Sequence, residues 1–99
     1  MTLKPILSFE AEEELLNAAQ WYEARSEGLG LAFLDQVETV MDNVGRNTLQ
    51  YPVVYRDVRR ALTRRFPFGV FFRVHENGRV KVIAVMHLAR KPERWQRRR

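Results

Sequence analysis

The dipeptide Asn77-Gly78, set between two apolar segments, constrains the fold of this chain more than any other feature. A type I′ turn needs positive φ at both central residues, and Asn-Gly meets that need best. Residues 70–74 and 80–86 flank the dipeptide and are rich in β-branched and aromatic residues. The sequence therefore predicts a β-hairpin over these two segments.

The register of this hairpin decides which side chains share a face of the sheet. A two-residue loop places Phe72 opposite Ile83. One face then carries Val70, Phe72, Val74, Ile83 and Val85, and the other carries Phe71, Val80, Val82, Ala84 and Met86. Because both faces are apolar, we expect the hairpin to lie in the centre of its sheet, covered on both sides.

Two amphipathic helices are predicted before the hairpin. Apolar residues at helical spacing indicate one over about residues 9–25, with Ser8 as its N-cap, and a second over about residues 31–45. The loop between them is short and contains Gly28, which suits a left-handed position, so the helices should be antiparallel. Trp21 lies off the apolar stripe. We interpret it as core of the helical hairpin, with a partner-binding anchor as the alternative.

The remaining segments supply the other strands. Residues 3–9 predict an edge strand or an extended lead-in, because Pro5 cannot donate a backbone hydrogen bond. Residues 51–57 predict a loop or an irregular extended piece. Residues 58–66 alternate and predict a strand that carries four arginines.

This order of elements predicts an α+β fold of the type β-α-α-β-β-β. We expect an N-terminal edge strand and an antiparallel two-helix hairpin packed on a mainly antiparallel β-sheet. Residues 1–99 should form a single domain, in which about 91–99 are a basic, frayed tail. The sequence contains no segment typical of a signal peptide or a transmembrane span.

Charge is distributed unevenly along the chain. Residues 1–50 hold three basic and nine acidic groups, a balance of −6, whereas residues 51–99 hold fourteen basic and three acidic groups, a balance of +11. Such asymmetry indicates a basic half that faces a partner, either nucleic acid or an acidic protein. The alternative is a rim of arginines that only keeps the protein soluble.

The residue types exclude several kinds of site. The chain has no cysteine, which excludes disulfides and thiolate metal sites and fits a cytoplasmic location. His75 and His87 have no clustered carboxylates beside them and do not indicate a metal site. The only serines, Ser8 and Ser26, are a helix cap and a loop residue. We expect no metal and no cofactor.

Arginines and one histidine remain as candidates for chemistry. Metal-free RNA cleavage needs a base, an acid and cations that stabilise the phosphorane. His87 is the candidate for the acid or the base, because histidine can do either near neutral pH, and Arg73 is among the arginines that can supply the positive charge. The sequence does not identify the second acid–base group.

Four segments carry motifs that point to a known family, at residues 10–23, 28–38, 64–74 and 82–95. The last segment contains the pattern H-x-x-R-x-P-x-x-W, formed by His87, Arg90, Pro92 and Trp95. With these motifs the chain resembles the RelE/ParE superfamily, the toxin half of type II toxin–antitoxin modules, and most of all its ParE-type branch.

The resemblance implies the same fold that the element order predicts. It also implies a small cytoplasmic bacterial toxin, of the kind associated with plasmid stabilisation. A cognate antitoxin would hold it inactive, in a toxin–antitoxin hetero-oligomer, through a segment that folds on binding.

Two target classes are known in the superfamily. RelE-type members cleave mRNA on the ribosome, whereas ParE-type members poison DNA gyrase without being nucleases. Gly69 stands where RelE-type toxins usually carry a catalytic arginine, so we expect a gyrase-directed toxin. A RelE-type endoribonuclease that uses His87 and Arg73, or an inactive antitoxin-binding protein, remains the alternative. The residues expected to bind target or partner are Arg64, Arg65, Arg73, His87, Arg90 and Trp95.

Overall fold

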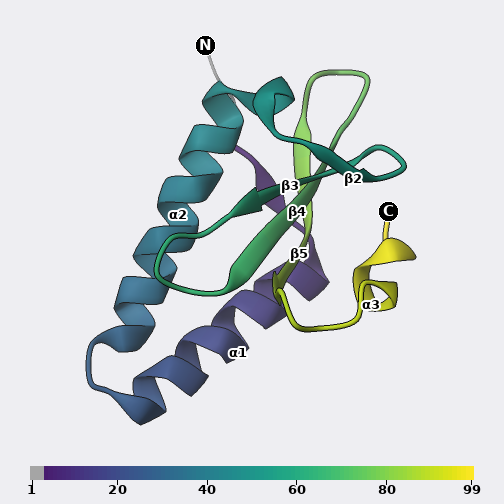
Figure 1. Ribbon diagram of the computed structural model, residues 1–99. Coiled ribbons are helices and arrows are strands. Elements are labelled where there is room, and N and C mark those ends of the chain that lie inside the picture. The colour runs from purple at the N-terminus through teal and green to yellow at the C-terminus, as the bar shows by residue number, and fades with distance from the viewer. Residues whose placement is uncertain (1–3) are drawn as a thin grey trace.

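A five-stranded sheet, with strand order β1-β5-β4-β3-β2, is the centre of the molecule, and the computed structural model describes residues 4–99 (Figure 1). The strands are β1 (Ile6–Leu7), β2 (Val53–Tyr55), β3 (Val58–Leu62), β4 (Phe68–Val74) and β5 (Val80–His87). β1 pairs with β5 in parallel, and the other neighbours are antiparallel. The predicted α+β fold, with its N-terminal edge strand, is confirmed. Residues 1–3, which include the first residue of the predicted strand, lie outside the described range.

Two long helices, α1 (Phe9–Arg25) and α2 (Leu29–Arg46), cover one face of the sheet. α1 has the predicted bounds, and the Ser8 hydroxyl accepts a hydrogen bond from the Ala11 N–H at 3.1 Å, as an N-cap does. α2 begins two residues earlier than predicted. Gly28 adopts the left-handed conformation, with φ of 84°, and the Glu23 carboxylate accepts the N–H groups of Gly28 and Gly30. No described helix has the length and apolar character needed to cross a membrane.

The hairpin between β4 and β5 differs from the predicted register near its turn. Val70 faces Val85 as predicted, but the pairing shifts between Phe71 and Phe72, so that Phe72 pairs with Val82. Gly78 has φ of 81°, whereas Asn77 is not among the residues with positive φ. The prediction of a type I′ turn is therefore wrong. The Gly78 N–H donates to the His75 carbonyl at 2.8 Å and closes a longer loop over residues 76–78.

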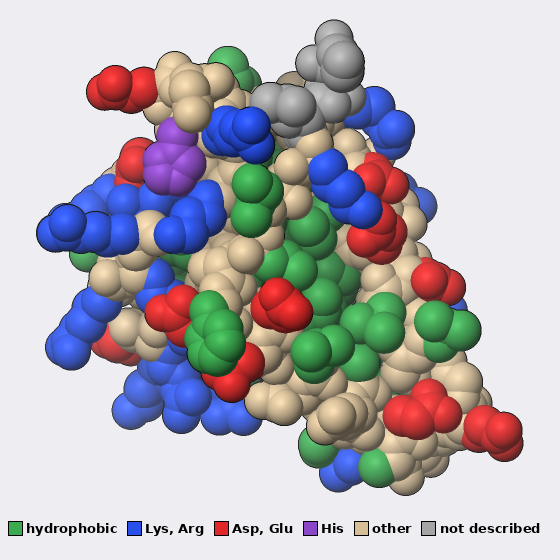
Figure 2. Space-filling model, turned by 180° about the vertical axis from the view of Figure 1, so that it is seen from behind, with side chains coloured by type: hydrophobic (Ala, Val, Ile, Leu, Met, Phe, Trp, Pro, Cys, Tyr) green, Lys and Arg blue, Asp and Glu red, His purple; other side chains and the backbone are tan. Residues whose placement is uncertain are grey.

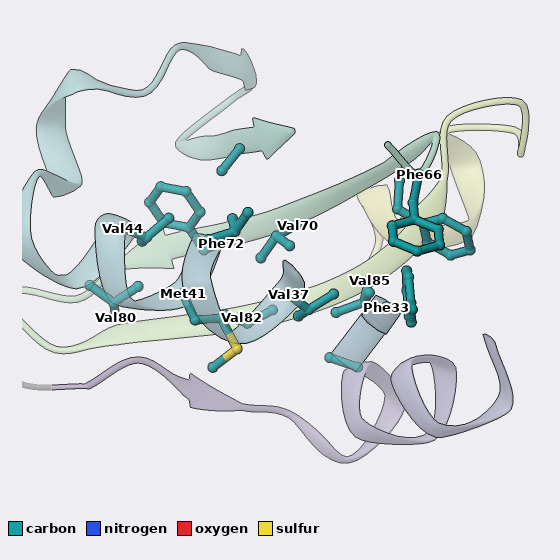
Figure 3. Close-up of a cluster of buried hydrophobic side chains, with 14 of the residues drawn as sticks. Phe33, Val37, Met41, Val44, Phe66, Val70, Phe72, Val80, Val82 and Val85 are labelled. Carbon is teal, nitrogen blue, oxygen red and sulfur yellow. The ribbon is translucent and has the colours of Figure 1, made fainter. Parts of the chain in front are cut away.

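The shift in register changes which side chains face the helices. Val80 and Val82 pack with Val85 in the core beneath α1 and α2, which Figure 3 shows together with side chains of α2 and β4. Ile83 joins the opposite face, with Phe71, Ala84 and Met86. The predicted faces of Val80, Val82 and Ile83 are thus wrong, because one extra residue in β5 inverts the alternation on either side of it.

The segments around β3 are also reorganised. The predicted loop over residues 51–57 contains the edge strand β2, and the predicted strand over residues 58–66 ends at Leu62. Arg65 has φ of 70°, in the left-handed region, so the chain turns here and does not continue as a regular strand to Phe66. A short 3₁₀ helix, Thr48–Gln50, links α2 to β2.

The C-terminal residues, which were expected to fray, contain the short helix α3 (Glu93–Gln96). Trp95 is only 5% exposed and stacks on Phe71, with ring centroids 4.3 Å apart and an angle of 25° between the planes. Tyr55 of β2 meets the same indole edge-on. Burial of a large aromatic surface therefore holds the tail against the face of the sheet that α1 and α2 leave open.

Candidate functional site

An open groove of about 770 Å³ lies between α1 and the C-terminal end of β5. Its apolar floor includes Ala18 and Tyr22 of α1, Phe68 of β4 and Val85 of β5. Met86 also borders the groove, although its side chain packs on the other face of the sheet. Its polar lining comes from Glu14, Asn17, His87, Arg90 and Arg94. The groove therefore combines an apolar base with a rim on which cations outnumber carboxylates.

His87 ends β5 and stands directly opposite Phe68 in the hairpin. Its ring lies edge-on to the Phe68 ring, with centroids 5.4 Å apart. The Nδ1 atom accepts a hydrogen bond from the Ala89 N–H at 3.0 Å, which leaves the proton of the neutral ring on Nε2. His87 thus presents a donor at the mouth of the groove.

Arg90 and Arg94 add positive charge on the side of the groove that the tail supplies. The Arg90 N–H donates to the His87 carbonyl at 3.0 Å, in a turn that brings the chain back beside the end of β5. Both arginines are exposed. They are free to meet an anionic group that enters from solvent.

Trp21 supplies an aromatic wall on α1. It is 53% exposed, so our interpretation of it as core is wrong. The neighbouring Tyr22 takes the core position instead, in edge-on contact with Phe66 and tilted contact with Phe33. The guanidinium of Arg25 lies 3.4 Å above the Trp21 ring, a cation–π contact that adds another positive charge beside the indole.

Two groups in the groove have well-defined charge states or partners. Burial raises the pKa of the Tyr22 phenol above its ordinary value of 10.0, so the phenol is neutral at physiological pH with a wider margin than a free tyrosine. The Glu14 carboxylate accepts the Val85 N–H at 3.1 Å and forms an ion pair with Arg98 at 2.9 Å. The one carboxylate in the groove lining is therefore already neutralised.

Arg73 belongs to a different surface. It follows Phe71 by two residues on β4, so it projects from the face that carries Trp95, whereas His87 stands opposite Phe68 on the helical face. Arg73 lies 3.6 Å from Asp57 in the turn after β2. The histidine and arginine considered for RNA cleavage thus lie on opposite sides of the sheet.

The other predicted site residues are also dispersed. Arg64 and Arg65 lie in the turn after β3, where the Arg64 N–H donates to the Gln36 side chain of α2 and Arg65 lies over the Phe66 ring. Trp95 is buried. Of the six predicted residues, His87 and Arg90 alone line the groove.

Sequence reasoning did not place Glu14, Asn17 or Arg94 in the site. The one available signal is that Arg94 lies inside the pattern H-x-x-R-x-P-x-x-W, directly before Trp95. Within residues 4–99, no three histidine, aspartate or glutamate side chains come together as a metal site would require.

A second basic surface lies on the face of the sheet opposite α1 and α2. Arg60 pairs with Phe71 across β3 and β4, so Arg60 and Arg73 share this face. The Nε atoms of both are buried and find no acceptor among the described residues. Figure 2, the view from behind, shows the wider division of charge: lysine and arginine gather toward the hairpin and the tail, and acidic side chains lie over the helices.

Residues 6–92 match the family model described as "ParE toxin of type II toxin-antitoxin system, parDE". A solved structure described as "Chromosomal ParDE TA system from P. aeruginosa" is similar, with a TM-score of 0.70 and 18% sequence identity. The similarity covers 85% of this chain and 96% of that chain, and at this identity it shows the fold alone. No curated protein is significantly similar in sequence.

Proposed function

Because this chain belongs to the ParE toxin family, which its residues 6–92 match, we propose that it is a growth-inhibiting toxin that poisons DNA gyrase by protein contact. We propose also that a cognate antitoxin neutralises it and that it acts in the cytoplasm. The groove between α1 and the end of β5 is the surface that we assign to gyrase.

The composition of the groove carries this proposal. An apolar floor with Arg90, Arg94 and His87 at its rim suits a protein segment that offers apolar side chains flanked by carboxylates. Trp21 and the arginines are also the residue types that contribute most to binding at protein interfaces. A surface that bound only phosphates would gain little from the apolar floor.

The placement of His87 and Arg73 supports a protein target rather than RNA cleavage. An acid–base residue and the cation that stabilises the phosphorane must both reach one phosphate. These two side chains project from opposite faces of the sheet. A single scissile phosphate therefore cannot contact both.

The antitoxin proposal rests on the family and on the apolar surface that the chain leaves exposed. The similar solved structure is described as a ParDE TA system, which supports an antitoxin partner here. Phe9, Leu16 and Leu31 are exposed on the helices, and Figure 2 shows hydrophobic side chains along the helical layer between acidic groups. An antitoxin segment that folds on binding can cover such a surface.

The proposal is tested with purified protein and purified gyrase. We expect the protein to inhibit supercoiling and to trap cleaved DNA, and an equimolar amount of antitoxin to restore supercoiling. Unchanged supercoiling at concentrations that arrest growth would overturn the gyrase assignment. Primer extension on mRNA after induction is the parallel measurement, and cuts positioned by codon would instead indicate a ribosome-dependent endoribonuclease.

A further inference from the structure

Glu14 connects three parts of the molecule that are far apart in the sequence. It lies on α1, its Oε1 atom accepts the Val85 N–H of β5, and its two oxygens receive Arg98 Nη1 and Nη2 at 2.9 and 3.0 Å. Arg98 Nη1 also donates to the Ile83 carbonyl at 3.1 Å. One carboxylate and one guanidinium thus join α1, β5 and the C-terminal tail.

Among the described residues, no backbone hydrogen bond joins the tail, residues 91–99, to the sheet or to the two long helices. Its backbone hydrogen bonds are local, such as those from Trp95 and Gln96 to the Pro92 carbonyl and from Arg98 to the Trp95 carbonyl. The Trp95 indole, stacked on Phe71, is the anchor on one side. The pair formed by Glu14 and Arg98, which we call the clasp, is the anchor on the other.

The clasp lies beside the groove. Glu14 itself lines the groove, as does Arg94. Arg94 and Arg98 are four residues apart, and the intervening Arg97 keeps helical φ and ψ, so both side chains lie on the same side of α3 and its extension. Fixing Arg98 on Glu14 therefore fixes where Arg94 stands.

We infer that Glu14 and Arg98 are positioning residues, which hold Arg94 at the groove wall and so form the cationic side of the partner-binding site. Neither needs to touch the partner, because their charges satisfy each other. This inference rests on the proposed function of the groove. The bidentate geometry and the low exposure of the two side chains, 23% and 20%, make the pair stronger than an ordinary surface ion pair.

Substitutions at the clasp separate this role from general stability. Glu14→Gln keeps an oxygen for the Val85 N–H but removes the charge, and Arg98→Ala removes the other partner. Arg97→Gln is the matched control, because Arg97 is an exposed arginine one residue away. For the fluorescence measurement alone, each protein carries Trp21→Phe in addition, so that Trp95 is the one tryptophan and its fluorescence reports on the tail. Inhibition is measured with Trp21 in place, because Trp21 lines the groove.

We expect both clasp variants to raise acrylamide quenching of Trp95 and to weaken gyrase inhibition about tenfold, the effect of losing one charged hydrogen bond. Arg98→Lys, which keeps the charge but not the two-point contact, should fall between wild type and Arg98→Ala. The control should match the Trp21→Phe protein in quenching and wild type in inhibition. Circular dichroism should show that each variant retains the wild-type secondary structure.

Two results would overturn the inference. One is unchanged Trp95 quenching in both clasp variants, which would show that the clasp does not hold the tail. The other is increased quenching with full inhibition, which would show that the position of the tail does not matter for binding. If the wild-type protein leaves gyrase untouched, the proposed function fails, whereas the quenching measurement still tests whether the clasp holds the tail.

Discussion

His87 and Arg73 project from opposite faces of one sheet, although both lie on the hairpin formed by β4 and β5. His87 stands opposite Phe68, beneath the helices, and Arg73 lies on the face where Trp95 packs. Charge that is crowded together in the sequence is therefore divided between two surfaces. An arginine contributes to the groove only if it lies on the helical side of the sheet.

This division predicts different effects for two arginine substitutions. Arg90→Ala should weaken the proposed inhibition of gyrase about tenfold, because it removes a cation from the groove rim. Arg73→Ala should leave inhibition within about twofold, because Arg73 is outside the groove. The measurement is the half-inhibitory concentration in a supercoiling assay, with Arg64→Ala as a second control, and equal losses for Arg90 and Arg73 would contradict the assignment.

Trp95 and Trp21 should differ sharply in their contribution to stability. Trp95→Ala removes a buried indole stacked on Phe71 and should lower the free energy of unfolding by about 3–4 kcal/mol. Trp21→Ala removes a half-exposed indole and should cost about 1 kcal/mol or less. Urea unfolding measures both, and similar losses for the two variants would show that the tail is not packed as described.

Gly69 tests the room available on the far face of the sheet. A Cβ added there would lie 3.0 Å from the Phe71 ring and 3.2 Å from Leu88. Phe71 is held by Trp95 and has little freedom to retreat, so Gly69→Ala should lower the free energy of unfolding by about 1–3 kcal/mol. Combining it with Trp95→Ala should reduce that loss, since the ring then has space to move. The same crowding shows why a large side chain at this position would not fit the present packing.

The hairpin turn predicts a larger effect at Gly78 than at Asn77. Gly78→Ala forces a left-handed backbone conformation on alanine and should lower the free energy of unfolding by about 1 kcal/mol. The loss should be no larger, because a Cβ there meets no other atom. Asn77→Ala removes only the hydrogen bond from the Arg79 N–H to the Asn77 side chain and should cost less. Thermal unfolding of the two variants gives the comparison.

Alkaline pH should destabilise the protein partly through Tyr22. Burial raises the pKa of its phenol above the ordinary value of 10.0, so the unfolded chain releases its proton at a lower pH than the folded chain. The free energy of unfolding should therefore fall as pH rises through about 10. Tyr22→Phe should reduce this slope. Lys4, whose pKa is raised by its hydrogen bond with Glu38, contributes in the same direction and would remain.

Local signals in the sequence were sufficient for much of the fold. The Ser8 cap and the helical spacing that follows it gave the bounds of α1, because both depend on neighbouring residues. The hairpin turn was misjudged because its register depends on distant contacts. Val80, Val82 and Val85 all meet the helices, and only an extra residue between Val82 and Val85 allows this.

The site was less accessible to sequence reasoning. His87 and Arg90 were identified because they belong to one recognisable pattern near the end of β5. The groove also needs Glu14 and Trp21, which are more than sixty residues away in the sequence, and no local pattern links them to His87. With fourteen arginines in the chain, spacing alone could not show which of them line a common surface.

The clasp also limits self-association of this protein through strand pairing. β1 covers only two residues of β5, and beyond it the Ile83 carbonyl and the Val85 N–H are occupied by Arg98 and Glu14 instead of by another strand. These side chains thus block the addition of another strand at one edge of the sheet. The opposite border, β2, carries exposed Val53 and Val54, and within residues 4–99 no further strand pairs with it. Unwanted strand pairing between molecules should therefore begin at β2, and Val54→Lys should suppress it.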